Sequence, residues 1–174
     1  MRDFEDTVAA FRNRIYTLSY YFLGHKEEAE DATQEALIRL WENWNKVRGA
    51  NALAWLLRVT RNVCMDVLRK RRSGHAVVSG NDFDAALATI PGNAPDPREA
   101  LETSDLQEQV RKALTRIDEP YRSIVILREI QQMSYAEITE ALGIPLPTVK
   151  VYLHRGRRML REQLRERGAD AYER

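Results

Sequence analysis

Residues 134–158 read SYAEITEALGIPLPTVKVYLHRGRR, and this stretch decides the fold of the C-terminal part of the chain. Its apolar residues recur at helical spacing on both sides of a short turn that contains Gly143. Ser134 and Glu137 have the spacing of a capping box, in which each side chain can satisfy a backbone amide at the start of a helix. Gly143 suits the positive-φ corner of such a turn. The stretch therefore predicts a helix-turn-helix.

The second helix of this motif should bury one side and expose a basic one. Val149 and Leu153 can face Ile138 and Leu142 of the first helix, which leaves the opposite side free to enter a major groove. Basic side chains there could donate to base edges, while flanking hydroxyl and guanidinium groups suit phosphates. The residues that we predict to contact DNA are Thr148, Lys150, Val151, Tyr152, His154, Arg155, Arg157 and Arg158.

The rest of the chain also has helical periodicity. All six prolines lie at or beyond Pro91, so the first 90 residues carry none of the strongest helix breaker. No segment combines sustained apolar–polar alternation with β-branched residues, so we predict an all-α fold. The predicted helices cover residues 4–22, 26–44, 52–72, 98–116, 120–131, 135–142 and 147–166, with a loop at 45–51.

A change in composition divides the chain into two small helical domains. Residues 75–97 contain three prolines and have weak periodicity, which is typical of a flexible linker. From His75 to Gln109, seven acidic residues oppose a single arginine, so the connector is acidic. We predict domains at 1–73 and 98–174, the second ending in the helix-turn-helix, and a linker at 74–97.

The net charge of +1 hides two basic helices, one in each domain. Residues 52–74 carry six basic side chains against one acidic one, and residues 148–167 carry seven against two. Two separated basic surfaces suit a ligand with separated phosphate tracts, such as a nucleic acid. Residues 24–44 differ, because there six acidic side chains oppose two basic ones.

Membrane and disulfide-rich classes are excluded by composition. The longest apolar runs fall far short of the roughly 20 residues that a bilayer demands, and the N-terminus MRDFEDTVAAFR has no apolar signal core. We therefore expect a cytoplasmic protein that is not embedded in a membrane. Cys64 is the only cysteine and should pack between helices, and three scattered histidines form no zinc pattern. We expect no metal and no cofactor.

Two segments of the first domain carry functional patterns. Residues 55–72, WLLRVTRNVCMDVLRKRR, combine basic, aromatic and amide side chains, as nucleic-acid-binding surfaces do. Residues 31–41, DATQEALIRLW, direct Ala36, Leu37 and Leu40 toward a core. The other side of this predicted helix is acidic with an apolar centre, which suits a basic protein surface. That side carries Asp31, Gln34, Glu35 and Ile38.

In order and spacing these motifs resemble the extracytoplasmic-function (group four) sigma factors of bacterial RNA polymerase. In that family an acidic D-x-x-Q-E helix precedes a W-L-x-R-x-x-x-N-x-x-x-D-x-L-R helix, and a second domain carries the motifs found here between Ser134 and Lys150. The resemblance covers nearly the whole chain. It implies a non-catalytic subunit that binds core polymerase and opens promoter DNA under the control of an anti-sigma factor, with no small-molecule substrate.

The resemblance also implies roles for single residues. Those expected to contact the β′ clamp helices of the polymerase are Asp31, Gln34, Glu35, Ile38 and Trp41. Those expected to bind the minus-ten element, whose flipped base the loop at 45–51 would capture, are Arg48, Asn51, Arg58, Arg61, Asn62 and Arg69. The helix that begins at Pro147 would read the minus-thirty-five element, and a linker segment near Phe83, Leu87 and Ile90 would run through the polymerase.

The chain departs from the common family pattern at Pro147, Val151, Tyr152 and Gly156. Promoter preference therefore does not follow from the resemblance. Gly156 within the helix is expected to cost roughly 0.5 to 1 kcal/mol relative to alanine, because glycine loses more backbone freedom.

Two alternatives compete with this interpretation. A helix-turn-helix regulator that binds duplex DNA unaided would not need the second basic segment at 58–72. A helical metalloenzyme could use His25, Glu27, Glu30 and Asp31, but the sequence lacks the Glu-x-x-His pairs that carboxylate sites in helix bundles use.

Overall fold

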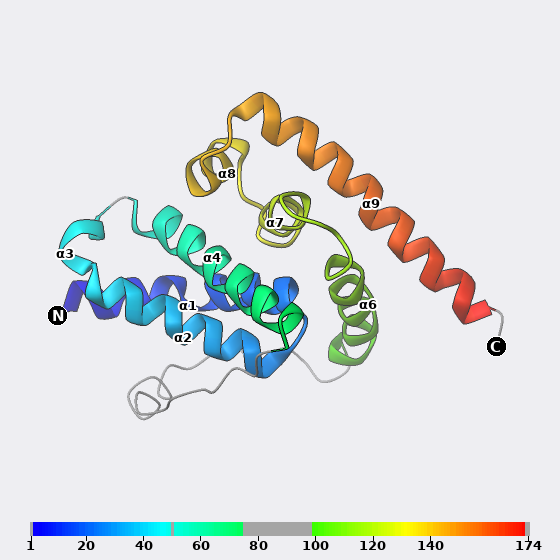
Figure 1. Ribbon diagram of the computed structural model, residues 1–174, viewed down its shortest axis with the longest axis horizontal. Coiled ribbons are helices and arrows are strands. Elements are labelled where there is room, and N and C mark those ends of the chain that lie inside the picture. Colours follow the sequence, from blue (N-terminus) through cyan, green and yellow to red (C-terminus); the bar gives the residue numbers. More distant parts are fainter. Residues whose placement is uncertain (1, 50, 75–98, 173–174) are drawn as a thin grey trace.

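The computed structural model describes residues 2–49, 51–74 and 99–172, and every regular element among them is a helix (Figure 1). The first domain contains α1 (Arg2–Leu23), α2 (Lys26–Glu42), α3 (Trp44–Val47) and α4 (Ala52–Arg72). The second contains α6 (Glu99–Leu114), α7 (Tyr121–Val125), the π-helix η1 (Ile126–Ile130), α8 (Tyr135–Leu142) and α9 (Leu146–Tyr172). The predicted all-α fold with two helical domains is confirmed. The predicted linker, with Phe83, Leu87 and Ile90, lies outside the described residues apart from its first residue.

The first domain is built on α1, α2 and α4, which pack against one another (Figure 1). Ile15, Phe22, Leu40 and Leu56 have no exposed surface, and full burial of such a side chain contributes roughly 1.5 to 3 kcal/mol. Cys64 is also buried, and this burial raises the pKa of its thiol to about 12. The cysteine therefore acts as a small packing residue, as the sequence predicted.

The second helix ends earlier than the sequence predicted. Asn43 interrupts it after Glu42, and the Asn43 side-chain amide donates to Arg39 O at 2.8 Å. Trp44 then starts α3, which extends into the predicted loop at 45–51, and the Trp44 ring packs edge-on against Phe4 with centroids 5.3 Å apart. The loop before α4 is shorter than predicted because this aromatic contact anchors a further helical turn.

The helix-turn-helix of the second domain is confirmed. Ser134 Oγ accepts from the Glu137 amide at 3.2 Å, and the Glu137 carboxylate accepts from the Ser134 amide at 2.7 Å. Gly143 ends α8 with a left-handed φ of 67°. Val149 and Leu153 of α9 are buried, so the predicted inward face of the second helix is also correct.

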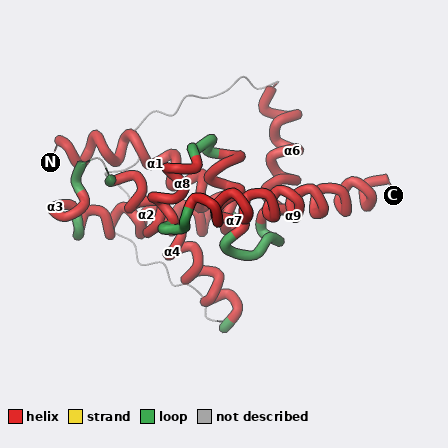
Figure 2. The backbone as a smooth tube through the Cα atoms, turned by 90° about the horizontal axis from the view of Figure 1, so that it is seen from above, coloured by secondary structure: helices red, strands yellow, loops and turns green. Residues whose placement is uncertain are grey.

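The predicted helix at 120–131 is divided in two. It begins as α7 and continues as the π-helix η1, in which the Gln131 amide donates to Ile126 O at 3.1 Å. Residues 122–127 are all buried, so this segment has no solvent-facing side. In Figures 1 and 2, α7 lies at the centre of the molecule, between α4 and α9. This central position explains the unbroken run of buried side chains in this segment.

Gly156 is a site of close helix packing, which reverses the expectation from helix propensity. A Cβ at this position would lie 2.5 Å from Val125 Cγ2 and 3.3 Å from Tyr121 O. The absence of a side chain therefore lets α9 approach α7. Alanine would gain helix propensity but collide with a buried methyl group.

The two domains contact each other along α4 and along the end of α1. The helix α4 packs on α8, and α1 packs on α6 and α7 (Figure 1). No feature of the sequence predicted this arrangement. Among the described residues, no helix is long and apolar enough to cross a membrane, and no group of three or more His, Cys, Asp or Glu could hold a metal ion.

Candidate nucleic-acid interface

The helix α9 presents the exposed basic surface that the sequence predicted. Six of the predicted DNA contacts are exposed, namely Lys150, Val151, His154, Arg155, Arg157 and Arg158. Thr148 and Tyr152 are half-buried. Because positions four apart lie on one side of a helix, Lys150, His154 and Arg158 form a single row. This row is a suitable surface for the edges and phosphates of a duplex groove.

Neighbouring helices hold several of these side chains in place. The ammonium of Lys150 lies 5.9 Å from the centroid of the Tyr135 ring, within the range of a cation–π contact. Arg157 Nη2 forms an ion pair with Glu129 at 2.6 Å. Tyr152 packs edge-on against Tyr121, so its ring supports the helix and only part of it is accessible.

The predicted polymerase-binding face lies on α2. Ile38 and Trp41 are 37% and 54% exposed, which is unusual for large apolar side chains. Trp41 is held edge-on against Phe4 at 4.9 Å. Glu35 pairs with Arg39 at 2.8 Å, and Asp31 and Gln34 are half-buried on the same helix. The result is an apolar centre with an acidic and amide border, presented to solvent.

The predicted minus-ten residues occupy two places. Arg48 and Asn51 are exposed in the connection between α3 and α4. Asn62 and Arg69 are exposed on α4, where Arg69 Nη2 pairs with Asp66 at 3.1 Å. The two remaining predicted minus-ten residues, Arg58 and Arg61, bind the second domain instead.

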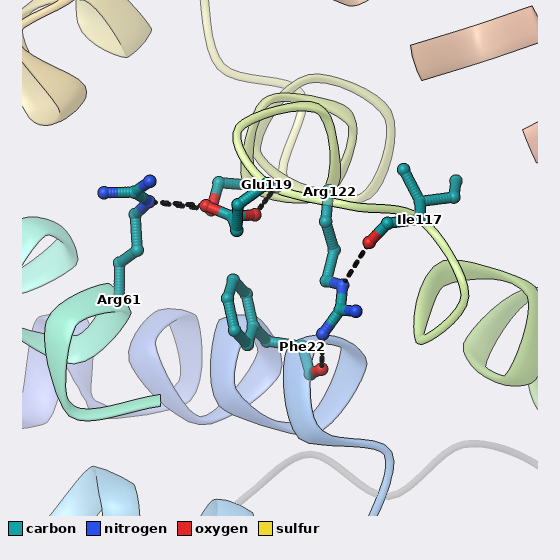
Figure 3. A network of polar contacts seen from close by, with 6 residues as sticks. Phe22, Arg61, Ile117, Glu119 and Arg122 are labelled. Carbon is teal, nitrogen blue, oxygen red and sulfur yellow. Dashed lines mark hydrogen bonds and ion pairs between the residues drawn. The ribbon is translucent and has the colours of Figure 1, made fainter. Parts of the chain in front are cut away.

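Arg58 and Arg61 donate their hydrogen bonds across the domain interface. Arg58 donates to Glu140 O at 2.8 Å and to Ala141 O at 3.2 Å, which are carbonyls in the last turn of α8. Arg61 Nε donates to Glu119 Oε2 at 2.7 Å (Figure 3). These two guanidinium groups, predicted to hold DNA, are therefore occupied by protein groups.

Arg122 is a functional residue that the sequence analysis missed. It is 7% exposed and donates to Ile117 O at 2.8 Å and to Phe22 O at 2.9 Å (Figure 3). It also donates to Thr115 O at 2.7 Å. Its guanidinium also lies 5.0 Å from the Phe22 ring centroid. Burial lowers the pKa of Arg122 from its usual value. The sequence offered one signal for a buried arginine, namely that Arg122 directly precedes the mostly apolar run at 123–127.

The C-terminal end of α1 is capped by three arginines from three helices. Arg122 of α7 donates to Phe22 O, Arg71 of α4 donates to Leu23 O at 3.0 Å, and Arg111 of α6 donates to Gly24 O. The last turn of α1 contains no basic residue of its own. Positive charge is favourable at a helix C-terminus. Arg111 and Arg122 of the second domain therefore supply charge that α1 does not carry at this end.

The sequence matches known protein families in both domains. The model of sigma-70 region 2 matches residues 7–74, and that of sigma-70 region 4 matches residues 107–160. The ECF RNA polymerase sigma factor SigW of Bacillus subtilis is 34% identical over 167 residues, which cover 94% of this chain and 89% of the relative. The ECF RNA polymerase sigma factor SigE of Mycolicibacterium smegmatis is 31% identical over 170 residues, 98% of this chain and 65% of the relative.

Two solved structures share the fold at 20% sequence identity. The sigma factor RpoE in complex with the anti-sigma factor NepR from Bartonella quintana has a TM-score of 0.67 and covers 95% of this chain and 98% of its own. CnrH in complex with the cytosolic domain of CnrY has a TM-score of 0.66 and covers 94% and 88%. Since relatives above 30% identity align with both domains, the chain belongs to the ECF sigma factors of RNA polymerase.

Proposed function

We propose that the chain is a dissociable promoter-specificity subunit that binds core RNA polymerase, holds the opened minus-ten strand and anchors the minus-thirty-five duplex. The observation that carries this proposal is the presence of two basic helical surfaces, on α4 and α9, in the two domains of a sigma factor. The chain has no catalytic step of its own in this scheme, and the chemistry belongs to the polymerase.

The polymerase contact is assigned to α2. Exposed Ile38 and Trp41 supply apolar area, and Asp31, Gln34 and Glu35 border it. Interfaces commonly place an apolar centre within a polar rim, and the acidic rim suits a basic partner. The β′ clamp helices of the polymerase are the proposed partner of this surface.

The minus-ten contact is assigned to the α3–α4 connection and to α4. Flipping a base out of the duplex costs a few kcal/mol, so the freed base and strand need binding groups of their own. Arg48 and Asn51 are exposed at the connection, where a flipped base would bind. Arg58, Arg61, Asn62 and Arg69 of α4 would hold the strand, once Arg58 and Arg61 are free of the second domain.

The minus-thirty-five contact is assigned to the exposed row on α9. Lys150 and Arg155 suit guanine edges, His154 can donate to a base, and Val151 can contact a thymine methyl. Thr148, Tyr152, Arg157 and Arg158 are assigned to phosphates, which fix the register of the helix in the groove.

Control by an anti-sigma factor is also proposed. Of the two solved structures described above, one is a sigma factor in complex with an anti-sigma factor, and the other is CnrH in complex with the cytosolic domain of CnrY. We place the protein in the cytoplasm with its polymerase, assign it no cofactor and no metal, and divide it into domains at 1–73 and 98–174 joined by a linker at 74–97.

Run-off transcription with core polymerase and a library of random promoters tests this assignment. Alanine at Asp31 and Glu35 should weaken polymerase association, measured by co-migration on a sizing column. Alanine at Lys150 and Arg155 should leave association unchanged and lower promoter occupancy. Equal loss of polymerase binding in both double variants would contradict the assignment of separate surfaces.

A further inference from the structure

Phe4, near the start of α1, lies against two tryptophans of the neighbouring elements. Its ring centroid is 4.9 Å from that of Trp41 at an interplanar angle of 72°, and 5.3 Å from that of Trp44 at 84°. Both contacts have the edge-to-face geometry that aromatic pairs prefer. In Figures 1 and 2 the N-terminal end of α1 lies beside α3. One phenyl ring therefore joins the start of α1 to the end of α2 and to α3.

The first of these tryptophans belongs to the proposed polymerase-binding surface. Trp41 is 54% exposed, and tryptophan is enriched among the residues that contribute most to the affinity of protein interfaces. A side chain that is already held in its bound orientation loses less conformational freedom on binding. The contact with Phe4 therefore gives Trp41 a fixed orientation before the polymerase arrives.

The second tryptophan begins a helix that is too short to be stable alone. The helix α3 has four residues, Trp44–Val47, whereas isolated helices of fewer than about 12 residues are marginal in water. It therefore depends on tertiary contacts. The ring contact between Phe4 and Trp44 supplies one of them, and Val47 packs against the core.

The turn of α3 leads directly to residues that we assign to the minus-ten element. The Arg48 amide donates to Trp44 O at 2.9 Å, so the backbone of Arg48 is tied to the residue that Phe4 contacts. A flipped base must find its binding groups in place, because its extrusion from the duplex is itself unfavourable. Movement of Trp44 would therefore disturb the site that captures this base.

We propose that Phe4 is a positioning residue for two functions, because its ring orients Trp41 for the polymerase and, through Trp44, fixes the connection that captures the flipped base. This inference rests on the proposed function, which assigns Trp41 to the polymerase and Arg48 to the minus-ten element. Phe4 touches neither partner in this scheme. Loss of its ring should therefore act through the two tryptophans.

Phe4→Leu tests the proposal, since leucine keeps an apolar side chain but removes the ring. Fluorescence anisotropy of the labelled full chain gives the Kd for core polymerase, and permanganate reactivity of the minus-ten region gives promoter opening at saturating holoenzyme. We expect a Kd about fivefold higher and opening about threefold lower. Phe4→Tyr keeps the ring and should stay within about twofold of wild type in both measurements.

Phe11→Leu is the matched control, because it makes the same substitution at a half-buried position of α1 that packs against the core. Both measurements should stay within about twofold of wild type. Circular dichroism melting checks that each variant is folded. Equal effects of Phe4→Leu and Phe11→Leu would overturn the proposal, because a general loss of packing would explain them.

The two tryptophans separate the two functions. Trp41→Ala should mainly raise the Kd for polymerase, and Trp44→Leu should mainly lower promoter opening, whereas Phe4→Leu should change both. If Phe4→Leu changes only one of them, the double role is wrong.

A double variant shows whether Phe4 acts through Trp41. Added to Trp41→Ala, Phe4→Leu should raise the Kd by less than about twofold, because the side chain that it orients is already absent. An undiminished increase would show that the Phe4 ring acts elsewhere, and the proposal would be wrong.

The single tryptophan variants also distinguish failure of this inference from failure of the proposed function. An unchanged Kd in Trp41→Ala would contradict the assignment of Trp41 to the polymerase, and the inference would fail with it. If both tryptophan variants have the expected effects while Phe4→Leu behaves like Phe11→Leu, only the inference about Phe4 fails.

Discussion

The basic segments of α4 and α9 have similar composition but different surroundings. Residues 52–74 carry six basic side chains against one acidic one, and residues 148–167 carry seven against two. On α9 the basic row is exposed, and its supporting contacts with Tyr135 and Glu129 come from its own domain. On α4 two arginines are held by the other domain. Charge counts therefore identify both surfaces, but only the packing shows which one is available to a ligand.

The largest expected effect comes from Arg122, which joins the two domains. Arg122→Met leaves two buried carbonyls and one half-buried carbonyl without their donor, and we expect a loss of about 3 kcal/mol in the free energy of unfolding. Urea denaturation followed by circular dichroism measures it. Arg116→Met, at an exposed position in the loop between α6 and α7, should stay within about 0.5 kcal/mol of wild type. Similar losses of stability in both variants would contradict the role of Arg122 in joining the two domains.

The next prediction concerns the support of the α9 surface by α7. Gly156→Ala gains up to about 1 kcal/mol of helix propensity but places a methyl group 2.5 Å from Val125 Cγ2. Overpacking of this kind costs about 1 to 3 kcal/mol, so we expect a net loss of about 1 kcal/mol and a lower melting temperature. An increased melting temperature would mean that α9 does not pack as closely on α7 as described.

A third prediction compares the two surfaces directly through salt dependence. Each lysine or arginine that contacts a phosphate adds about one released ion to the slope of log K against log salt. In the free chain, Arg158→Ala on exposed α9 should reduce the slope for duplex DNA by about one. Arg61→Ala should leave that slope unchanged, because Glu119 occupies this guanidinium. A slope that falls equally for both variants would show that the surfaces are equally accessible.

The sequence predicted the elements whose signals are local. Ser134, Glu137 and Gly143 define both ends of α8 by backbone chemistry within a few residues, and these ends are correct. The role of Gly156 could not be predicted from local sequence, because it depends on Val125 and Tyr121 of α7, which pack against this glycine in the folded chain. Helix propensity alone favours alanine there, whereas the packing favours glycine.

In the candidate sites, too, the features that depend on local sequence were predictable and those that depend on distant residues were not. Exposure of Lys150, His154 and Arg155 follows from the helical period, since the inward positions of α9 were recognisable. The partners of Arg58 and Arg61 belong to residues about 60 to 80 positions away in the sequence, and no local pattern encodes such a pairing. A basic residue count cannot distinguish a free guanidinium from one bound by a carbonyl.

The smallest expected effect tests whether the two ends of α8 behave differently. Its N-terminus is capped within its own domain by Ser134 and Glu137, whereas its C-terminal carbonyls are capped by Arg58 of the other domain. The backbone amide of Ser134 and, to a smaller extent, its side chain hold the pKa of Glu137 below its usual value through hydrogen bonds. A carboxyl group whose pKa is lower in the folded state stabilises the fold at pH values above its unfolded pKa of about 4.3. This contribution is lost as the pH falls through the pKa of the folded state.

Ser134→Ala keeps the backbone amide that donates to the Glu137 carboxylate and removes only the side-chain hydrogen bond. It should therefore raise the Glu137 pKa only part of the way toward its ordinary value and make the loss of stability below about pH 4.3 somewhat smaller. Carboxyl carbon NMR titration measures the pKa, and urea denaturation at several pH values measures the stability. Arg58→Ala removes only the cap at the other end of the helix, so it should leave the Glu137 titration unchanged. A shifted titration in Arg58→Ala would mean that domain contact reaches the start of α8, and the two ends of this helix would not be independent.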